Sequence, residues 1–363
     1  MHWLDFFHDL GLAGNLAVFT VAAAVVWLAG DRLARYSQVI ADRTRLGQAF
    51  IGTILLGVTV SLPEMTLAAV AAALGNAELA VNSLLGGIGI TMVVLAITDL
   101  AVGDEPLSID VQHPVVLLQG ALVILMLTVA AGGITAGDRL LPGVGVAGAW
   151  TTMLAGLFIV SLVLVKILQG YHPWTPDAVL EAPHAGEQPG ACLSSPSNEV
   201  EHDHAARALG SVICLTALAA AGVLAAGTVL AFSADALAVQ TGLGAGFIGL
   251  IFGGIATSLP ELSTTVSAVR LKQYEMTFSD AFGTNLASLA LLFVADVLYV
   301  GEPLLNQVGR FSTFAVLLGC ALTAIYLAGL VARVRRGVWR MGIDSLTVLV
   351  VSSLGFVILY HLI

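Results

Sequence analysis

Ten long apolar segments constrain this chain more than any other feature of its sequence. A helix that spans the hydrocarbon core of a bilayer needs roughly 20 mostly apolar residues. The segments that meet this condition are residues 13–32, 47–73, 77–100, 113–132, 142–166, 208–232, 242–269, 275–300, 311–332 and 341–361. Only 10% of the 363 residues are charged, against about 25% in soluble domains, so the chain cannot cover a water-facing surface. We therefore expect an all-α polytopic membrane protein with ten transmembrane helices.

The same composition excludes several classes of protein. A cytosolic enzyme and a nucleic-acid-binding protein both need more surface charge than this chain carries. The three cysteines are too few and too scattered for a disulfide framework or a zinc site. We expect no cofactor and no nucleic-acid partner, and the sequence leaves the oligomeric state open.

A polar segment at 169–206 divides the ten helices into two groups of five. It contains five of the eleven prolines, six acidic residues, four of the eight histidines and no Lys or Arg. Such a composition is typical of a disordered linker, and histidines in a linker usually bind nothing specific. We therefore expect a first membrane half at 1–168, a linker at 169–206 and a second membrane half at 207–363.

Basic residues predict which side of the membrane each loop faces. When the ten helices are threaded in order, twelve of the fourteen Lys and Arg fall on one side. These are Arg32, Arg35, Arg43, Arg45, Lys166, Arg207, Arg270, Lys272, Arg333, Arg335, Arg336 and Arg340, against Arg139 and Arg310 on the other side. Because cytoplasmic loops are enriched in basic residues, we expect the linker to be cytoplasmic and both termini extracytoplasmic. The first ten residues lack the basic region of a cleaved signal peptide, so we expect none.

Two segments of the chain are copies of each other, residues 46–107 and 243–304. At a fixed offset of 197, 20 of the 62 aligned positions are identical, including SLPE at 61–64 and at 258–261. SLPE lies in an apolar segment that is too long for one straight crossing, so we expect a broken helix in each copy. Because five helices separate the copies, they cross the membrane in opposite directions, as the inverted repeats of many secondary transporters do.

The SLPE segments place one carboxylate near the middle of the membrane in each copy. A charged group there costs roughly 3 kcal/mol or more, so Glu64 and Glu261 indicate a functional site. The alternative is a pair of buried carboxyl groups kept neutral by hydrogen bonds. Because proline lacks an N–H, the proline before each glutamate frees the carbonyl four residues earlier, that of Thr59 or of Ala256.

Hydroxyl groups accompany these carboxylates. Ser61 precedes Glu64 in the first copy, and Thr257 and Ser258 precede Glu261 in the second. Neither copy contains His or Cys, which argues against zinc or copper. Carboxylate, hydroxyl and carbonyl oxygens are the ligands of hard cations such as calcium, so the two copies together predict a cation site.

The helix that follows SLPE in the second copy adds further oxygen atoms. Asp280, Thr284 and Ser288 lie at four-residue spacing and therefore share one helix face, with Asn285 beside them. We interpret Asp280 either as a third carboxylate of the site or as the N-cap of this helix. The corresponding face of the first copy ends at Thr91.

These motifs resemble the alpha repeats of the sodium/calcium exchanger (calcium/cation antiporter) superfamily. The duplicated TSLPE-like segment and the following G-(S/T)-N patch carry the resemblance, which covers nearly the whole chain outside 169–206. It implies a prokaryotic inner-membrane antiporter that exchanges calcium for sodium or protons by alternating access. It also implies that Glu64 and Glu261 bind calcium, and that Ser61, Thr257, Ser258, Thr284 and Ser288 complete the cation sites.

The first copy departs from the pattern of this superfamily. Val60 stands where Thr is usual, Gly87 and Ile88 replace the Ser and Asn of the G-S-N patch, and Thr91 replaces a later Asn or Asp. The second copy keeps Thr284 and Asn285 but has Ser288 at that later position. These changes remove side-chain oxygens that the resemblance assigns to sodium. Calcium-for-sodium exchange is thus the main prediction, and the alternatives are exchange coupled to protons, exchange of another cation, or cation binding without transport.

Overall fold

The computed structural model describes residues 7, 10–44, 48–73, 75–102, 106–109, 111, 113–137, 147–168, 209–241, 254–333, 337–338 and 341–362. The helices of the first half are α2 (Gly11–Thr44), α3 (Gln48–Ile51), the π-helical η1 (Gly52–Gly57), α4 (Val58–Val60), α5 (Leu62–Ala73), α6 (Ala77–Val102), α7 (Pro114–Ala136) and α8 (Ala149–Leu168). Those of the second half are α10 (Leu209–Thr241), α12 (Gly254–Arg270), α13 (Tyr274–Leu298), the 3-10 turn η4 (Leu304–Gln307), α14 (Arg310–Ala332) and α15 (Ile343–Leu362). Two short strands, β1 (Gly337–Val338) and β2 (Met341–Gly342), pair antiparallel just before α15.

The all-α, ten-helix architecture is confirmed. Eight described helices are long and apolar enough to cross a membrane, and α12 and the series α3–η1–α4–α5 supply the other two. The largest difference from the expected spans is α2, which runs to Thr44 rather than ending near residue 32. Its last turns carry Arg32, Arg35 and Arg43, because polarity marks where a helix leaves the hydrocarbon and not where its backbone hydrogen bonds end.

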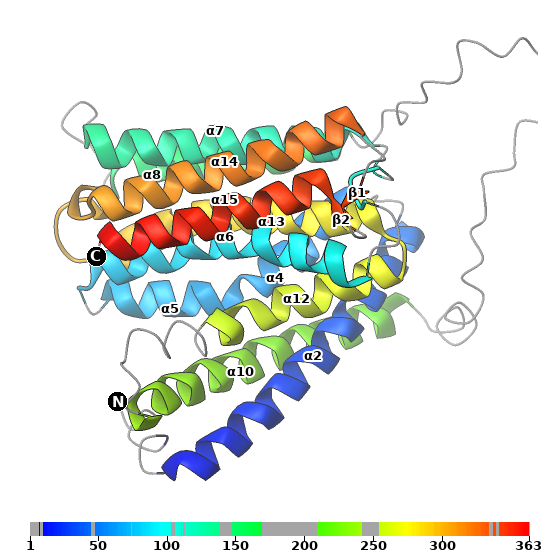
Figure 1. Cartoon of the computed structure of the whole chain (residues 1–363), viewed down its shortest axis with the longest axis horizontal. Coiled ribbons are helices and arrows are strands. Elements are labelled where there is room, and N and C mark those ends of the chain that lie inside the picture. The colour runs from blue at the N-terminus through cyan, green and yellow to red at the C-terminus, as the bar shows by residue number, and fades with distance from the viewer. Residues whose placement is uncertain are drawn as a thin grey trace, which may run out of the picture.

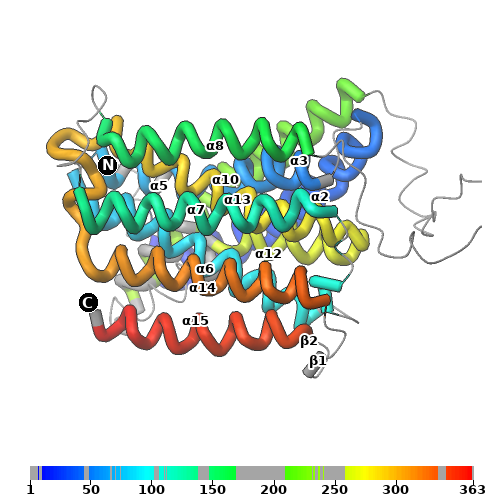
Figure 2. Tube along the Cα trace, turned by 90° about the horizontal axis from the view of Figure 1, so that it is seen from above, coloured from blue at the N-terminus to red at the C-terminus, as the bar shows by residue number. Residues whose placement is uncertain are grey.

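The helices form a main bundle with a separate pair packed along one side (Figure 1). α2 and α10 are this pair, and α2 also contacts α12. Within the bundle, α6 and α13 are the most deeply buried of the long helices. α7, α8, α14 and α15 form a layer on one side of them (Figure 2), and α5 and α12 contact them as well. The two halves of the chain are therefore interleaved, with α6 from one half packed directly on α13 from the other.

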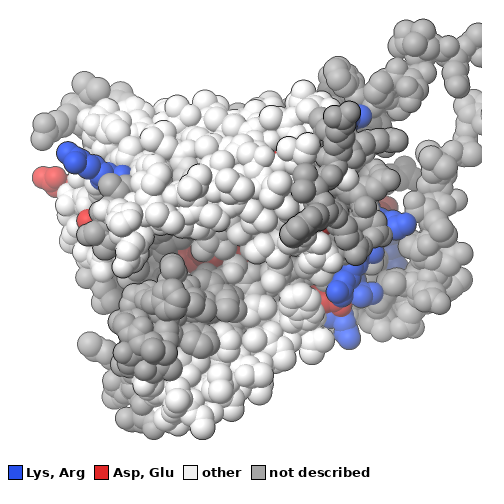
Figure 3. Space-filling view, viewed as in Figure 1, with Lys and Arg blue, Asp and Glu red and all other residues white. Residues whose placement is uncertain are grey.

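The two ends of the bundle differ in which chain segments they carry. α2 begins and α15 ends at one end, whereas α8 ends and α10 begins at the opposite end (Figure 1). Basic side chains gather at the end where α2 finishes (Figure 3). A chain that crosses the membrane an even number of times must begin and end on the same side, as α2 and α15 do. The linker at 169–206 lies outside the described residues.

The two SLPE segments differ in backbone geometry. In the first copy the helix is interrupted at Ser61, which is a turn residue between α4 and α5. In the second copy the expected break at SLPE is wrong, since α12 continues through Pro260. A proline removes only one backbone hydrogen bond, and a membrane helix tolerates that loss where neighbouring groups compensate for it. Residues 242–253, which precede α12, lie outside the described part of the chain.

α13 and η1 pack with their backbones in contact. A Cβ atom added to Gly283 would lie 2.5 Å from Cα of Thr53, and one added to Gly57 would lie 2.7 Å from N of Thr284. A buried polar network adjoins this crossing. The Ser279 hydroxyl donates a hydrogen bond to the side-chain amide oxygen of Gln119 (2.8 Å), and the side-chain amide nitrogen of Gln119 donates to the Thr53 hydroxyl. These contacts fix the first half of the broken helix against the helix that carries Asp280, Thr284 and Ser288.

Two aspartates form equivalent brackets at opposite ends of the bundle. Asp99 on α6 accepts hydrogen bonds from N–H of Leu107 (3.1 Å) and of Gly342 (2.8 Å), which precedes α15. Asp296 on α13 accepts them from N–H of Leu304 (2.7 Å) and of Gly148 (2.7 Å), which precedes α8. Each bracket thus joins the third helix of one half to the fifth helix of the other. Both carboxylates are buried and use both oxygens in these structural bonds.

Candidate cation site

Glu64 and Glu261 lie together in the interior of the bundle. Glu64 is in the first turn of α5 and Glu261 is one residue after Pro260 in α12. They are 7% and 5% exposed, and their carboxyl groups lie within hydrogen-bonding reach of each other. The inverted repeat therefore brings two residues 197 positions apart to one place. Two adjacent carboxylates repel each other unless a cation or a proton is shared between them.

Asp280 is close to this pair, and its interpretation as an N-cap is wrong. α13 begins at Tyr274, with Gln273 at the N-cap position, so Asp280 lies in the second turn. It is buried, and its Oδ2 accepts a hydrogen bond from the hydroxyl of Thr264 on α12 (3.0 Å). Its charge acts on Glu261. Asp280 is therefore a third carboxylate beside the pair.

Hydroxyl groups of both copies meet at one backbone carbonyl of the first broken helix, that of Gly57. The carbonyl of Gly57 accepts hydrogen bonds from the hydroxyl of Ser61 (2.7 Å) and from that of Thr284 (3.5 Å). Ser61 and Thr284 are thus brought together across the α13–η1 crossing. Thr59 is buried next to them, and its carbonyl faces no N–H at position 63 because that residue is proline.

Polar atoms without a partner concentrate at this site. Eight buried side-chain polar atoms of the described residues have no hydrogen-bond partner, and five of them belong to Glu64, Glu261, Asp280 and Asn285. Asn285 is fully buried on α13, and neither its amide oxygen nor its amide nitrogen is bonded. Since nearly all buried polar groups in native proteins are paired, these four residues are candidates for binding a ligand.

The remaining candidates contribute unequally. Ser288 is buried on α13, and Thr91 is buried on α6 with its hydroxyl donated to the Gly87 carbonyl (2.9 Å). Ser258 is partly buried in α12. The side chains of Thr257 and Ala256 lie outside the described residues, although their backbone belongs to α12.

The departures of the first copy put apolar side chains, or none, where the resemblance expects oxygen ligands. Val60 and Ile88 are almost completely buried, at 0% and 1% exposure. A Cβ atom added to Gly87 would lie 3.9 Å from Cγ of Glu64, so the position next to this glutamate carries no side chain. Apart from Glu64 and Ser61, the candidate side-chain oxygens therefore come mainly from α12 and α13.

The arrangement can hold a hard cation through two carboxylates and neutral oxygens. No group of three acidic, histidine or cysteine side chains converges on one point in the described ranges, so Asp280 adjoins the Glu64–Glu261 pair without closing a three-carboxylate cage. None of the three acids forms an ion pair with Lys or Arg in the same ranges. Uncompensated negative charge in a buried place favours a cation over an anion or a neutral solute.

Sequence reasoning missed Thr264 and Gln119, and it singled out the two bracket aspartates as either site residues or interfacial residues without predicting their bonds across the halves. Thr264 lies three residues after Glu261, so helical spacing places it on the same face, and that spacing was the available signal. Asp99 and Asp296 are matched in the two copies, which signals a shared role but not its kind. Gln119 is an isolated amide in an apolar helix, and its partners come from segments far away in the sequence.

Comparison with known proteins agrees with this geometry. The sequence pattern of the family described as sodium/calcium exchanger protein matches residues 14–167 and 211–363. The chain belongs to the sodium/calcium exchanger family. A curated relative is the inner membrane protein YrbG of Escherichia coli (strain K12), which is 26% identical over 301 residues and is matched over 82% of each chain.

Solved structures of the sodium-calcium exchanger NCX_Mj share the fold. One, soaked with sodium and strontium, has a TM-score of 0.69 at 16% identity and covers 94% of this chain and 98% of the other. Another, soaked with neither sodium nor calcium, has a TM-score of 0.66 at 14% identity, with 94% and 97% covered. The chain is therefore an integral membrane transporter of the calcium/cation antiporter superfamily with the inverted-repeat fold of the sodium/calcium exchangers.

Proposed function

We propose that the chain exchanges calcium for sodium across the inner membrane by alternating access. The observation that carries this proposal is the buried contact between Glu64 and Glu261, the two carboxylates that the inverted repeat brings together. Calcium binds between them, with Ser61, Thr284 and backbone carbonyls supplying neutral oxygens. Membership of the family supports cation exchange, and the two negative charges match one divalent ion.

Competition for the same carboxylates would couple the two ions. Sodium loading neutralises Glu64 and Glu261 in place of calcium, so the site releases one ion when it takes up the other. Asp280, Asn285 and Ser288 on α13, together with Thr91 on α6, Thr257 and Ser258 on α12, and the carbonyls of Thr59 and Ala256, are the residues that we assign to this cation region. The halves at 1–168 and 207–363 move relative to each other to expose the site to either side in turn.

The proposed topology places both termini outside and the 169–206 linker in the cytoplasm. Of the described Lys and Arg residues, only Arg310 lies at the end of the bundle where α2 begins. The positive-inside rule supports this orientation. Calcium is then carried out of the cell against an inward flow of sodium.

Proton coupling is the second candidate, and the apolar first copy favours it. Val60, Gly87 and Ile88 provide no side-chain oxygen, so neutral ligands that the resemblance assigns to sodium are missing, whereas the two glutamates remain. A proton needs none of these ligands because it binds directly to a carboxylate. This candidate keeps the same glutamates and changes only the coupling ion.

The test is calcium uptake into proteoliposomes under an outward sodium gradient, with an outward proton gradient in parallel. We expect sodium-driven uptake that is lost in Glu64→Gln and in Glu261→Gln. Uptake driven by protons alone would replace sodium with the second candidate. Calcium binding without flux under either gradient would contradict exchange and indicate a binding protein with the same fold.

A further inference from the structure

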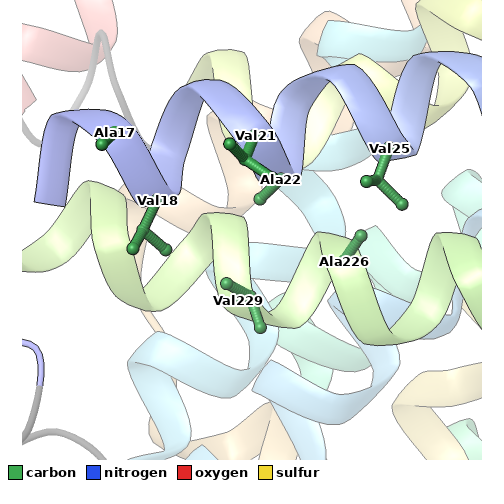
Figure 4. A pocket seen from close by; sticks show the side chains of 7 residues that line it. All are labelled: Ala17, Val18, Val21, Ala22, Val25, Ala226 and Val229. Carbon is green, nitrogen blue, oxygen red and sulfur yellow. The ribbon is translucent and has the colours of Figure 1, made fainter. Parts of the chain in front are cut away.

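An apolar groove lies between α2 and α10, the pair at the side of the bundle. Its volume is about 400 Å³, and the side chains that line it are Ala17, Val18, Val21, Ala22 and Val25 from α2 with Ala226 and Val229 from α10 (Figure 4). Val21 is 64% exposed and Leu28, one turn beyond the groove, is 62% exposed. This side of α2 therefore faces away from the protein, and in a membrane it faces lipid.

A single stripe of α2 connects this groove to a positive charge. Val18, Val21, Val25, Leu28 and Arg32 follow one another at intervals of three or four residues, so they lie on one helix face. Arg32 is exposed and forms no ion pair with any residue that the structure describes. The stripe is therefore apolar along most of its length and ends in the basic Arg32. The proposed topology places this end of the stripe at the cytoplasmic side of the membrane.

The neighbouring arginine on α2 is occupied by a protein partner. Arg35 donates hydrogen bonds to both carboxylate oxygens of Asp31, at 3.0 and 3.3 Å. Asp31 also accepts a hydrogen bond from Ser267 of α12 (2.9 Å). Arg32 is thus the guanidinium on this stripe that is free to bind an anion.

The distances along α2 match one phospholipid. At 1.5 Å per residue, Val25 lies about 10 Å and Val18 about 21 Å from Arg32 along the helix axis. Because α2 is inclined to the other helices (Figure 1), the corresponding depths in the membrane are smaller. One leaflet of the hydrocarbon core is about 15 Å deep, so an acyl chain whose headgroup lies at Arg32 ends within the groove.

We propose that an anionic phospholipid of the cytoplasmic leaflet binds to this stripe, with an acyl chain in the groove between α2 and α10 and its phosphate against Arg32. The groove has no polar lining that would select a headgroup. The acyl chain is therefore recognised in the groove, and the phosphate is recognised at Arg32. A zwitterionic lipid fills the same groove but gains less at Arg32, because its own ammonium group offsets the phosphate. The opposite end of the groove offers no basic residue on either helix, as the sequences of α2 and α10 show.

The position of the groove connects this lipid to the candidate site. Ala226 lines the groove, and a Cβ atom added to the next residue, Gly227, would lie 3.2 Å from Pro63, which precedes Glu64. On the other side, the carbonyl of Trp27 accepts a hydrogen bond from Ser263 of α12 (2.8 Å), two residues after Glu261. A lipid between α2 and α10 therefore contacts the two helices that pack against α5 and α12, which carry Glu64 and Glu261. This consequence for transport rests on the proposed function, and the choice of leaflet rests on the proposed topology, whereas lipid binding to the stripe rests on neither.

The binding test is native mass spectrometry of the delipidated protein with dioleoyl phosphatidylglycerol and, separately, dioleoyl phosphatidylcholine. We expect the anionic lipid to bind about fivefold more tightly, the factor that one basic residue contributes near an anionic membrane surface. Arg32→Gln should abolish this preference, and Val25→Phe should weaken binding of both lipids by filling the groove. The matched controls are Arg310→Gln, an exposed arginine at the other end of the bundle, and Val160→Phe, a lipid-exposed valine of α8 outside the groove.

Two results would overturn the lipid site. One is a preference for phosphatidylglycerol that persists in Arg32→Gln, and the other is an equal loss in the Arg310→Gln control. Melting temperatures of all four variants exclude unfolding as the cause. Calcium uptake is then compared in phosphatidylcholine vesicles with and without phosphatidylglycerol, and we expect stimulation that Arg32→Gln removes. Lipid selectivity without any uptake would refute the proposed function alone, whereas uptake without lipid selectivity would refute this inference alone.

Discussion

Replacing Gly283 with alanine tests the backbone contact on which the site is built. The new Cβ atom would lie 2.5 Å from Cα of Thr53 and 3.0 Å from its carbonyl oxygen, whereas ordinary contacts begin at 3.4 Å. The opposing atoms belong to backbone, so no side-chain rotation relieves the overlap. α13 and η1 must separate by about 0.9 Å, the difference between the first contact and an ordinary one.

The expected loss of stability follows from two opposing effects. Overpacking of a well-packed interior costs about 1–3 kcal/mol, and the absence of a flexible neighbour places this change near the upper limit. Alanine stabilises a helix over glycine by up to about 1 kcal/mol, which leaves a net loss of about 2 kcal/mol. With about 2.1 cal/mol/K of unfolding entropy per residue, the 363 residues of the chain give a fall in melting temperature of roughly 3 °C.

The control for this substitution is Gly156→Ala on α8. Gly156 is exposed, and an added Cβ atom would meet no described atom within 4 Å. Only the helix-propensity gain applies there, so we expect an unchanged or slightly raised melting temperature. Thermal unfolding of both purified variants in detergent measures the difference, which should be about 3 kcal/mol.

Transport provides a second measurement for Gly283→Ala. Metal sites tolerate displacements of about 0.2 Å in ligand distance, so a shift of α13 that moves Thr284 should raise the calcium concentration needed for half-maximal uptake. A Gly283→Ala protein that melts within 1 °C of wild type and transports with unchanged calcium dependence would refute the reasoning. It would mean that α13 and η1 are not in backbone contact.

Three further substitutions separate structural from ligand roles. Asp296→Asn replaces one accepting oxygen by a donor that faces N–H of Gly148, so it should lower stability by about 2–4 kcal/mol, since hydrogen bonds to charged groups contribute about 1.5–3 kcal/mol each. Asp99→Asn should lower stability in the same way, at N–H of Gly342. Both variants should bind calcium with wild-type affinity in an isotope-binding assay. A large loss of affinity would show that these two aspartates belong to the cation site. Asn285→Leu removes two unpaired buried polar atoms and should raise the stability of the calcium-free protein by about 1–3 kcal/mol. In wild type, calcium at 100 times its Kd adds about 2.7 kcal/mol, and thermal scans with and without calcium should show that Asn285→Leu loses most of this increment if Asn285 binds the ion.

The duplicated positions illustrate how far sequence patterns reach. Equal residues at offset 197 correctly indicated that Glu64 and Glu261 lie together, because an inverted repeat places matched residues around one axis. The same rule fails for Asp280, whose counterpart is Ser83. Ser83 bonds to a carbonyl of its own helix, that of Ala80 (3.1 Å), whereas Asp280 bonds to Thr264. The two copies therefore differ in sequence and in hydrogen bonding at this position, which makes the surroundings of the two glutamates asymmetric.

The expected break of the second helix failed for a related reason. Pro63 and Pro260 occupy equivalent positions, yet the helix turns at Ser61 in one copy and continues through Pro260 in the other. The position of a proline in the sequence identifies which backbone carbonyl loses its helical hydrogen bond. Whether the helix bends there depends on the neighbours that pack against it.

The sequence by itself determined the membrane class, the ten helices, the inverted duplication and the two central carboxylates. These are properties of hydropathy and of repeated local patterns, which follow from residue type and spacing alone. Only the tertiary structure decided that Asp280 lies inside α13, close to the two glutamates, rather than at the N-cap of this helix. It also decided that two aspartates join the halves of the chain, and that α2 and α10 enclose an apolar groove in line with Arg32. Those features depend on how distant helices cross, and crossing is set by contacts such as Gly283 against Thr53 that no local pattern encodes.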